Sequence, residues 1–294
     1  RNFSVSPIDQ LLTALRLYST GRHLLSVADF AGMHVSTTSR IVSRVSRAIA
    51  SLYRRYVKFP NDEMTIKATQ NNFFEIARFP CAIGALDCTH IKVQSWGQEN
   101  AEIYRNKKQY FSINVQAICN ANLEFIDVVD RWPRSCHDST IFNNCRRKRK
   151  FENGDYPNSI LLGDSGYPVS PYLLTPLLNP VSPQEHLYNE AHIRTRNVIE
   201  RTFGVWKRCF PILAYGCRLK QETLLNLIIA CAVLHNIARQ MGEEEPPLPQ
   251  EVNGHELQVL IDNGQIPHFQ NDRIERGIGA QIRRNFINNY FRHL

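Results

Sequence analysis

The sequence lacks the features that mark several specialised classes of protein. No apolar run approaches the ~18–20 residues of a membrane-spanning helix, and the best candidate, Leu224–Leu234, is about half as long. The eight cysteines include no Cys-x-x-Cys pair and no Cys/His spacing typical of a zinc finger. We therefore expect no membrane association, and we interpret the cysteines as reduced thiols of an intracellular protein. The sequence begins at Arg1 without a Met and shows no signal-peptide core, so we expect it to be a piece of a longer sequence.

Acidic residues are outnumbered in this chain of 294 residues. Lys and Arg total 35 against 27 Asp and Glu, which gives a formal net charge of +8. No acidic residue lies between Asp29 and Asp62, and a second basic run, RRKRK, occupies positions 146–150. This distribution favours a polyanionic partner such as nucleic acid over a merely soluble basic protein. Hydrophobic residues make up 43% and charged residues 21%, which excludes a mostly disordered chain.

The first 60 residues are expected to form a helical DNA-binding region. A helix that stops at Gly21 is followed by a short helix, a turn at Gly32 and a longer helix, which together predict a helix-turn-helix. Ser36 or Thr37 is expected to cap the longer helix. Its core face comprises Ile41, Val45, Ile49 and Leu52, and its exposed stripe comprises Arg40, Arg44 and Arg47. The stripe suits phosphate contacts, although a solvated face of an ordinary bundle is the alternative.

Residues 61–240 predict an α/β domain, and residues 241–294 a linker and tail. The expected strands are Cys81–Val93, Phe111–Cys119, Leu123–Val129 and Ser159–Gly163. The expected helices are 61–75, His137–Asn144, Ala191–Arg208 and Thr223–Arg239, with a proline-rich loop over 168–183. The chain therefore divides into three parts, of which the middle one carries the strands.

Three carboxylates stand in apolar surroundings, where a charge is costly unless something neutralises it. Asp87 lies within a strand, Asp164 at the end of another, and Glu200 on a helix. Converging carboxylates of this kind hold two Mg²⁺ ions in phosphoryl-transfer nucleases. The alternative gives each acid a structural role: Asp164 suits a turn, and Glu200 suits a pair with Arg196.

Five motifs carry a more specific signal. They are GALDCTHI (84–91), RWPRSCHDSTIF (131–142), LLGDSGYP (161–168), RNVIERTFGVWKRCF (196–210) and CAVLHNIA (231–238). In this order they resemble the PIF/Harbinger transposases, and especially the harbinger transposase-derived nucleases of animals. The similarity runs over about residues 7–240.

The resemblance implies a ribonuclease H-like mixed sheet with flanking helices. It implies a catalytic, metal-binding triad of Asp87, Asp164 and Glu200 with Mg²⁺, or Mn²⁺ in its place. The 35 residues between Asp164 and Glu200 match the family's spacing. His90, His137 and Asp138 are assigned supporting roles around the ligands, with Asp138 as the main competitor for a ligand position. The expected DNA-contacting residues are Arg40, Arg44, Arg47, Arg105, Lys107, Lys108, Arg146, Arg147 and Lys148.

The sequence therefore predicts a DDE endonuclease or transposase that cuts and joins double-stranded DNA at transposon ends and short A/T-rich targets. The resemblance implies a Myb-like DNA-binding partner protein. A homodimer is expected for pairing two ends, and the basic run at 146–150 predicts a nuclear location, with the cytoplasm as a second one. The alternative is a domesticated DNA-binding or chromatin-associated protein without transposition. A nuclease acting on RNA ranks last, since no RNA-recognition module is visible.

Overall fold

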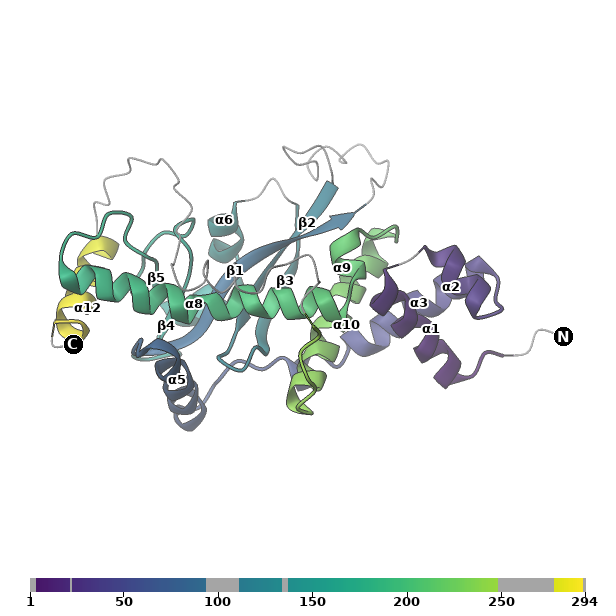
Figure 1. The fold of residues 1–294 in the computed structure, drawn as a ribbon, viewed down its shortest axis with the longest axis horizontal. Coiled ribbons are helices and arrows are strands. Elements are labelled where there is room, and N and C mark those ends of the chain that lie inside the picture. Colours follow the sequence, from purple (N-terminus) through teal and green to yellow (C-terminus); the bar gives the residue numbers. More distant parts are fainter. Residues whose placement is uncertain (1–3, 22, 94–110, 134–136, 248–277, 293–294) are drawn as a thin grey trace.

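The computed structural model describes residues 4–21, 23–93, 111–133, 137–247 and 278–292 (Figure 1). The N-terminal part is helical as predicted. Its elements are α1 (Pro7–Thr20), α2 (Leu24–Phe30), α3 (Val35–Ala50) and α4 (Tyr53–Tyr56). Gly21 ends α1 with φ 60°, and Gly32 makes the turn before α3 with φ 62°, both in the left-handed region that favours glycine.

Two details of α3 differ from the prediction. The residue that caps its start is His34, whose Nδ1 accepts from the Ser36 backbone N–H at 3.2 Å. Leu52 lies beyond the end of α3 and is 39% exposed, whereas Ile41 and Ile49 are buried as expected. Because α3 ends before Leu52, helical spacing from Ile41 and Ile49 no longer determines which way the Leu52 side chain points.

A five-stranded mixed sheet forms the centre of the protein, in the order β3-β2-β1-β4-β5. β1 pairs antiparallel with β2 and parallel with β4, while β2–β3 is antiparallel and β4–β5 parallel. The bounds are β1 Ala82–Val93, β2 Phe111–Cys119, β3 Phe125–Pro133, β4 Ile160–Leu162 and β5 Leu173–Leu174. The α/β class is confirmed. β3 starts later than predicted because Leu123, with φ 64°, belongs to the turn before it, and β3 also ends later, at Pro133.

Helices cover both faces of the sheet (Figure 1). The larger core packs alternate strand residues such as Ala85 against the long helices, and the smaller core packs Ile83 and Leu86 with Phe142 and Phe151. The remaining helices are α5 Glu63–Ala77, α6 Asp138–Asn143, α7 Arg146–Glu152, α8 Pro183–Cys209, α9 Ile212–Tyr215, α10 Gln221–Gln240 and α12 Ile278–Tyr290. Strand alternation thus gives the sheet two separately packed faces.

Helix α8 is eight residues longer at its start than the sequence predicts. Ser182 and Glu185 form a capping box, with Ser182 Oγ accepting from the Glu185 backbone N–H at 3.3 Å. Pro183 occupies the first turn, where its missing N–H costs nothing. The proline that indicated a loop therefore begins the helix.

Helix α10 has the length and hydropathy of a membrane span, yet it is packed within the fold. Leu224, Leu227 and Ile228 are fully buried. The helix packs along α3 and against β3, so the helical N-terminal region rests on the sheet domain. A helix apolar on most faces is explained by this central position.

Within the tail, α12 forms a helix that packs on the rest of the protein. α12 packs against α8, with Phe286 stacked on Phe79 at 5.6 Å between ring centroids. Arg283 is 1% exposed, and its Nη1 donates to the backbone oxygens of Thr175 and Pro176 at 2.9 and 3.1 Å. α12 therefore fixes the loop that follows β5.

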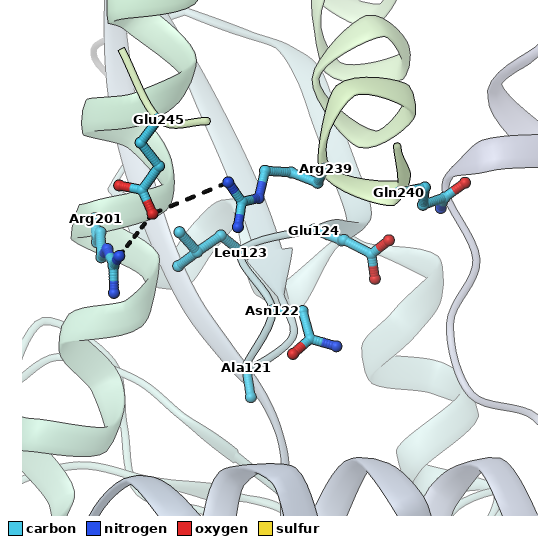
Figure 2. Close-up of a pocket in the computed structure, with 8 residues that line it drawn as sticks. All are labelled: Ala121, Asn122, Leu123, Glu124, Arg201, Arg239, Gln240 and Glu245. Carbon is cyan, nitrogen blue, oxygen red and sulfur yellow. Dashed lines mark hydrogen bonds and ion pairs between the residues drawn. The ribbon is translucent and has the colours of Figure 1, made fainter. Parts of the chain in front are cut away.

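A polar cavity of about 440 Å³ lies where the β2–β3 turn meets α8 and the end of α10. Figure 2 shows Glu245 between Arg201 and Arg239, at 2.6 and 3.9 Å from their guanidinium nitrogens. The residues that line the cavity include none of the three carboxylates. Both of its arginines pair with Glu245, and we assign the cavity no chemistry.

Candidate active site

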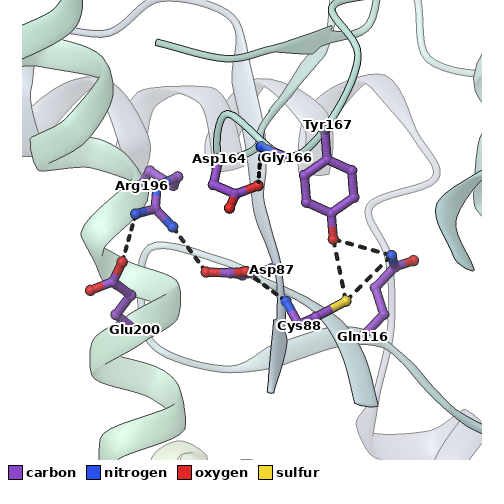
Figure 3. A network of polar contacts seen from close by, with 8 residues as sticks. All are labelled: Asp87, Cys88, Gln116, Asp164, Gly166, Tyr167, Arg196 and Glu200. Carbon is purple, nitrogen blue, oxygen red and sulfur yellow. Dashed lines mark hydrogen bonds and ion pairs between the residues drawn. The ribbon is translucent and has the colours of Figure 1, made fainter. Parts of the chain in front are cut away.

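The sheet register brings Asp87 and Asp164 together. Ala85 of β1 pairs with Leu162 of the parallel strand β4, and each aspartate stands two residues further along its chain. Neighbouring strands lie about 4.8 Å apart, so the two carboxylates extend from adjacent positions at the carboxyl end of β4. Glu200 comes from α8, which packs across β1 at this point. The strand, strand-end and helix carboxylates singled out in the sequence thus belong to one site (Figure 3).

Arg196 links two of the three acids. Its Nη1 lies 2.9 Å from Asp87 Oδ2, and its Nη2 lies 2.6 Å from Glu200 Oε1. Arg196 precedes Glu200 by one helical turn, which places both side chains on one face of α8. The side chains of Arg196 and Asp87 are 13% and 17% exposed, against 55% for Glu200. The pair that the sequence allowed between Arg196 and Glu200 is present, and it extends to Asp87.

Asp87 and Asp164 are each fixed by a backbone N–H. Asp87 Oδ1 accepts from the N–H of Cys88 at 2.7 Å, and Asp164 Oδ1 accepts from the N–H of Gly166 at 3.0 Å. The Asp164-Ser-Gly sequence therefore makes the expected turn, which also aims the carboxylate. The two aspartates have little freedom to move, whereas Glu200 is more exposed.

Burial dominates the electrostatics of the site. It raises the pKa of Asp87 to about 7, with the Arg196 guanidinium acting in the opposite direction and the Asp164 charge adding to the rise. Burial also raises the pKa of Asp164, again opposed by Arg196 and by the Gly166 N–H. Two desolvated carboxylates thus share one cationic side chain, and a further cation would stabilise their charged forms.

The donor set suits a divalent cation. All three groups are carboxylate oxygens, the ligands that Mg²⁺ and Mn²⁺ prefer. Within the described ranges, however, no three His, Cys, Asp or Glu side chains are arranged to hold an ion together. The ligand atoms therefore suit the ion chemically. Two of the three carboxylates, Asp87 and Glu200, are however paired with the Arg196 guanidinium that lies between them.

The opposite face of the sheet carries a polar network that the sequence analysis missed (Figure 3). Cys88 follows Asp87 and therefore points to the other face, where Tyr167 Oη lies 3.4 Å from its Sγ. Gln116 Nε2 donates to Tyr167 Oη at 3.2 Å. Burial raises the pKa of the Cys88 thiol and of the Tyr167 phenol, so both act as neutral groups. The available signal was the polar alternation of Ser112, Asn114 and Gln116 in an apolar strand.

Asp138 belongs to this second network. Its Oδ1 accepts from Asn114 Nδ2 at 2.9 Å, and its backbone oxygen accepts from Gln116 Nε2 at 3.2 Å. The Asp138 charge contributes to the raised pKa of Asp164, so it lies within electrostatic reach of the site. His137 is exposed at the start of α6 and makes no side-chain cap. His90 is half-buried on β1, and its carbonyl accepts from Lys207 Nζ at 3.2 Å.

The predicted DNA-contacting residues fall into three groups. Arg40, Arg44 and Arg47 are exposed on α3, although Arg47 pairs with Glu222 of α10 at 2.9 Å. Arg146 is exposed on α7, and Lys148 is half-buried beside Glu152 at 3.5 Å. The predicted contacts at Arg105, Lys107 and Lys108 lie outside the described residues.

Arg147 does not have the surface position that a DNA contact requires. Its side chain is 14% exposed, and its Nη2 lies 3.1 Å from Asp127 Oδ1. Its guanidinium also covers the Phe59 ring at 3.8 Å from the centroid, and its Nη1 donates to Tyr156 Oη. A buried carboxylate on β3 therefore engages this member of the basic run, and we remove Arg147 from the predicted DNA surface.

Comparison with known proteins gives matches over most of the chain. Residues 86–236 match the family model described as DDE superfamily endonuclease. "Putative nuclease HARBI1" of Homo sapiens is 32% identical over 82% of this chain and 70% of its own length. The Xenopus laevis protein of that name is 28% identical over 90% and 73%, and "Protein ALP1-like" of Arabidopsis thaliana is 26% identical over 83% and 64%. No solved structure matches the chain.

Proposed function

The chain belongs to the DDE superfamily endonucleases, among their harbinger transposase-derived members, and from this premise we propose that it is a metal-dependent endonuclease acting on double-stranded DNA. The observation that carries the proposal is the pairing of Ala85 with Leu162, from which Asp87 and Asp164 each lie two residues further on, together with the contact of Arg196 with both Asp87 and Glu200. The antiparallel β1–β2–β3 hairpins extended by the parallel strands β4 and β5 also support a ribonuclease H-like fold.

In the proposed reaction, Asp87 and Asp164 would hold Mg²⁺, or Mn²⁺ in its place, and Glu200 would complete the ligand set. The bound ions would lower the pKa of the attacking water and stabilise the leaving oxygen. Water adds to phosphorus as the P–O3′ bond breaks, which leaves a 5′-phosphate and a free 3′-OH. No covalent bond to the protein is required. In strand transfer, this 3′-OH would attack a target phosphodiester and form a new P–O bond as the target P–O3′ bond breaks, which releases a 3′-OH on the target strand.

The proposed DNA surface combines α3 and α7. Arg40, Arg44 and Arg47 present guanidinium groups at the surface, and Arg146 does so on α7, with Lys148 at its edge. Such side chains contact phosphates without reading sequence. We assign His90, His137 and Asp138 supporting roles, of which the Asp138–Asn114 contact is the best defined. We also propose that the protein forms a homodimer and works with a Myb-like partner protein. The proposed substrates are transposon ends and short A/T-rich targets, and the proposed location is the nucleus.

The domesticated DNA-binding or chromatin-associated role remains the second candidate. It is favoured by one observation, since Arg196 already pairs with both Asp87 and Glu200. In this role the carboxylates would be a structural cluster. The helical region and its arginines would then carry the whole activity.

Nicking of supercoiled plasmid distinguishes the two functions. Wild type is compared with Asp87→Asn and with Asp155→Asn, a control whose exposed carboxylate pairs with Lys150 at 3.4 Å. The proposal predicts Mg²⁺- or Mn²⁺-dependent nicking by wild type and the control, and none by Asp87→Asn. If no protein nicks with either ion, alone or with the Myb-like partner added, while all three bind DNA, the endonuclease is refuted and the DNA-binding role is favoured.

A further inference from the structure

Arg196 occupies the space between two carboxylates that the proposed function assigns to a metal. Its guanidinium nitrogens approach Asp87 and Glu200 at 2.9 and 2.6 Å, and the side chain is 13% exposed. An ion bound by the same two oxygens needs them about 2.1 Å from its centre. A guanidinium and an ion cannot both take that place, because they overlap and carry charge of the same sign.

The three members of this ion-pair network differ in freedom. Asp87 is held on its strand by the Cys88 N–H at 2.7 Å, so it cannot follow a departing partner. Glu200 is 55% exposed and follows Arg196 by one turn of α8. Arg196 can therefore turn away from Asp87, while the more exposed Glu200 has room to adjust toward an ion and Asp87 stays as the fixed ligand.

We propose that Arg196 is an exchangeable internal cation, which positions Asp87 and Glu200 until a divalent ion displaces it, and which thereby sets the affinity of the site for that ion. This inference rests on the proposed function, since it assumes that the ion binds at Asp87. Arg196 is accordingly a positioning residue, and its effect is on metal affinity and on the stability of the protein before the ion binds.

The partition of charge supports the exchange. Burial lowers the pKa of the Arg196 guanidinium. The negative charges of Asp87 and Glu200 raise this pKa by more than burial lowers it, so the guanidinium stays charged. Replacing it by one divalent ion leaves two buried aspartates better neutralised than before. The same replacement releases a cationic side chain next to the site, where DNA phosphate can pair with it.

Calorimetric titration with Mn²⁺ tests the proposal on the full chain. Arg196→Gln removes the charge and keeps a polar side chain, and Arg196→Lys restores a cation without the two-pronged geometry. Arg194→Gln is the matched control, because Arg194 lies on the same helix and pairs with Glu190 at 2.8 Å on the surface. We expect Arg196→Gln to bind Mn²⁺ at least about tenfold more tightly than wild type. Arg196→Lys should fall between them, and Arg194→Gln should match wild type.

Thermal unfolding provides a second readout on the same proteins. Before Mn²⁺ is added, Arg196→Gln should unfold at a lower temperature than wild type, because Asp87 loses its partner. Saturating Mn²⁺ should raise its Tm by more than it raises that of wild type. A merely structural arginine would lower stability without changing Mn²⁺ affinity.

If Arg196→Gln does not fold, the wild type itself is tested by NMR of its ¹⁵N-arginine side chains. The guanidinium signal absent from Arg196→Lys should change as Mg²⁺ saturates the site. One result would overturn the exchange alone. In it, Asp87→Asn abolishes ion binding, but the Arg196 guanidinium signal does not change with Mg²⁺ and the Arg196 variants bind Mn²⁺ as tightly as wild type. Ion binding that is the same in Asp87→Asn as in wild type, or absent from every protein, would overturn the exchange and the proposed metal site together.

Discussion

Two buried histidines should make the protein sensitive to acid. His192 of α8 is fully buried, and its Nε2 donates to the Leu174 carbonyl at 3.0 Å. His235 of α10 donates from Nε2 to the Leu123 carbonyl at 2.7 Å. Burial lowers the pKa of His192 to about 3 and that of His235 to about 4, so both imidazoles fold in the neutral form.

The sign and size of the effect follow from linkage. In the unfolded chain both histidines titrate near pH 6.5, so the unfolded state binds more protons as the pH falls below that value. Stability is therefore complete above pH 6.5 and is lost between pH 6.5 and the folded pKa values of about 3 and 4. At pH 5 each histidine should cost about 2 kcal/mol of unfolding free energy, or about 4 kcal/mol together.

Urea unfolding at pH 7.5 and pH 5.0 measures this loss. Wild type is compared with the variant His192→Gln/His235→Gln, in which neither position titrates. Contributions from carboxylates are common to both proteins and cancel in the difference. We expect wild type to lose about 4 kcal/mol more than the variant between the two pH values. Equal losses would show that neither imidazole is held neutral by burial, and would refute the reasoning.

Three further predictions concern packing and charge. Gly84→Ala should destabilise the protein by about 1–3 kcal/mol in thermal unfolding, because the new Cβ stands 2.5 Å from a methyl group of β2; Gly204→Ala, which meets only a flexible arginine at 3.3 Å, should be neutral or stabilising, and the reverse order would contradict the packing. Arg283→Met should cost about 2–3 kcal/mol, since it leaves loop carbonyls without their donor; an unchanged Tm would show that α12 does not secure that loop. Arg44→Gln should weaken DNA binding and reduce its salt dependence with little change in Tm, whereas Arg147→Gln should lower Tm and leave DNA affinity unchanged; exchanged effects would reverse our assignment of the two arginines.

Much of the fold was predictable because the determining signals are local. The β-branched pattern of Phe111–Cys119 gave both bounds of β2, and Gly21 and Gly32 marked turns that require positive φ. α6 and α10 were also found within two residues of their ends. The start of α8 was missed because the proline density around Pro183 outweighed the Ser182–Glu185 capping box.

Features set by distant partners were not predictable in the same way. Arg147 stands in a run of five basic residues, and only the folded chain brings Asp127 and Phe59 to it. The docking of α12 depends on Phe79, more than 200 positions earlier, and the sequence does not indicate that partner.

For the candidate site, residue types identified the three acids. Two readings of Arg196 and Glu200, ion pair and metal ligand, were open from the sequence. The structure shows the ion pair of Arg196 with Glu200. It also shows a contact of Arg196 with Asp87, which arises because α8 packs against β1. Such a contact depends on helix–sheet packing, which spacing along the chain does not specify.

The most direct test of the central claim compares four carboxylate-to-amide variants in Mn²⁺-dependent plasmid nicking. They are Asp87→Asn, Asp164→Asn, Glu200→Gln and Asp138→Asn. We predict that the first three lose nicking by at least about a thousandfold, while Asp138→Asn, whose carboxylate is held by Asn114 on the other face of the sheet, retains much of it. If Asp87→Asn, Asp164→Asn or Glu200→Gln nicks plasmid at the wild-type rate, the assignment of the site is contradicted.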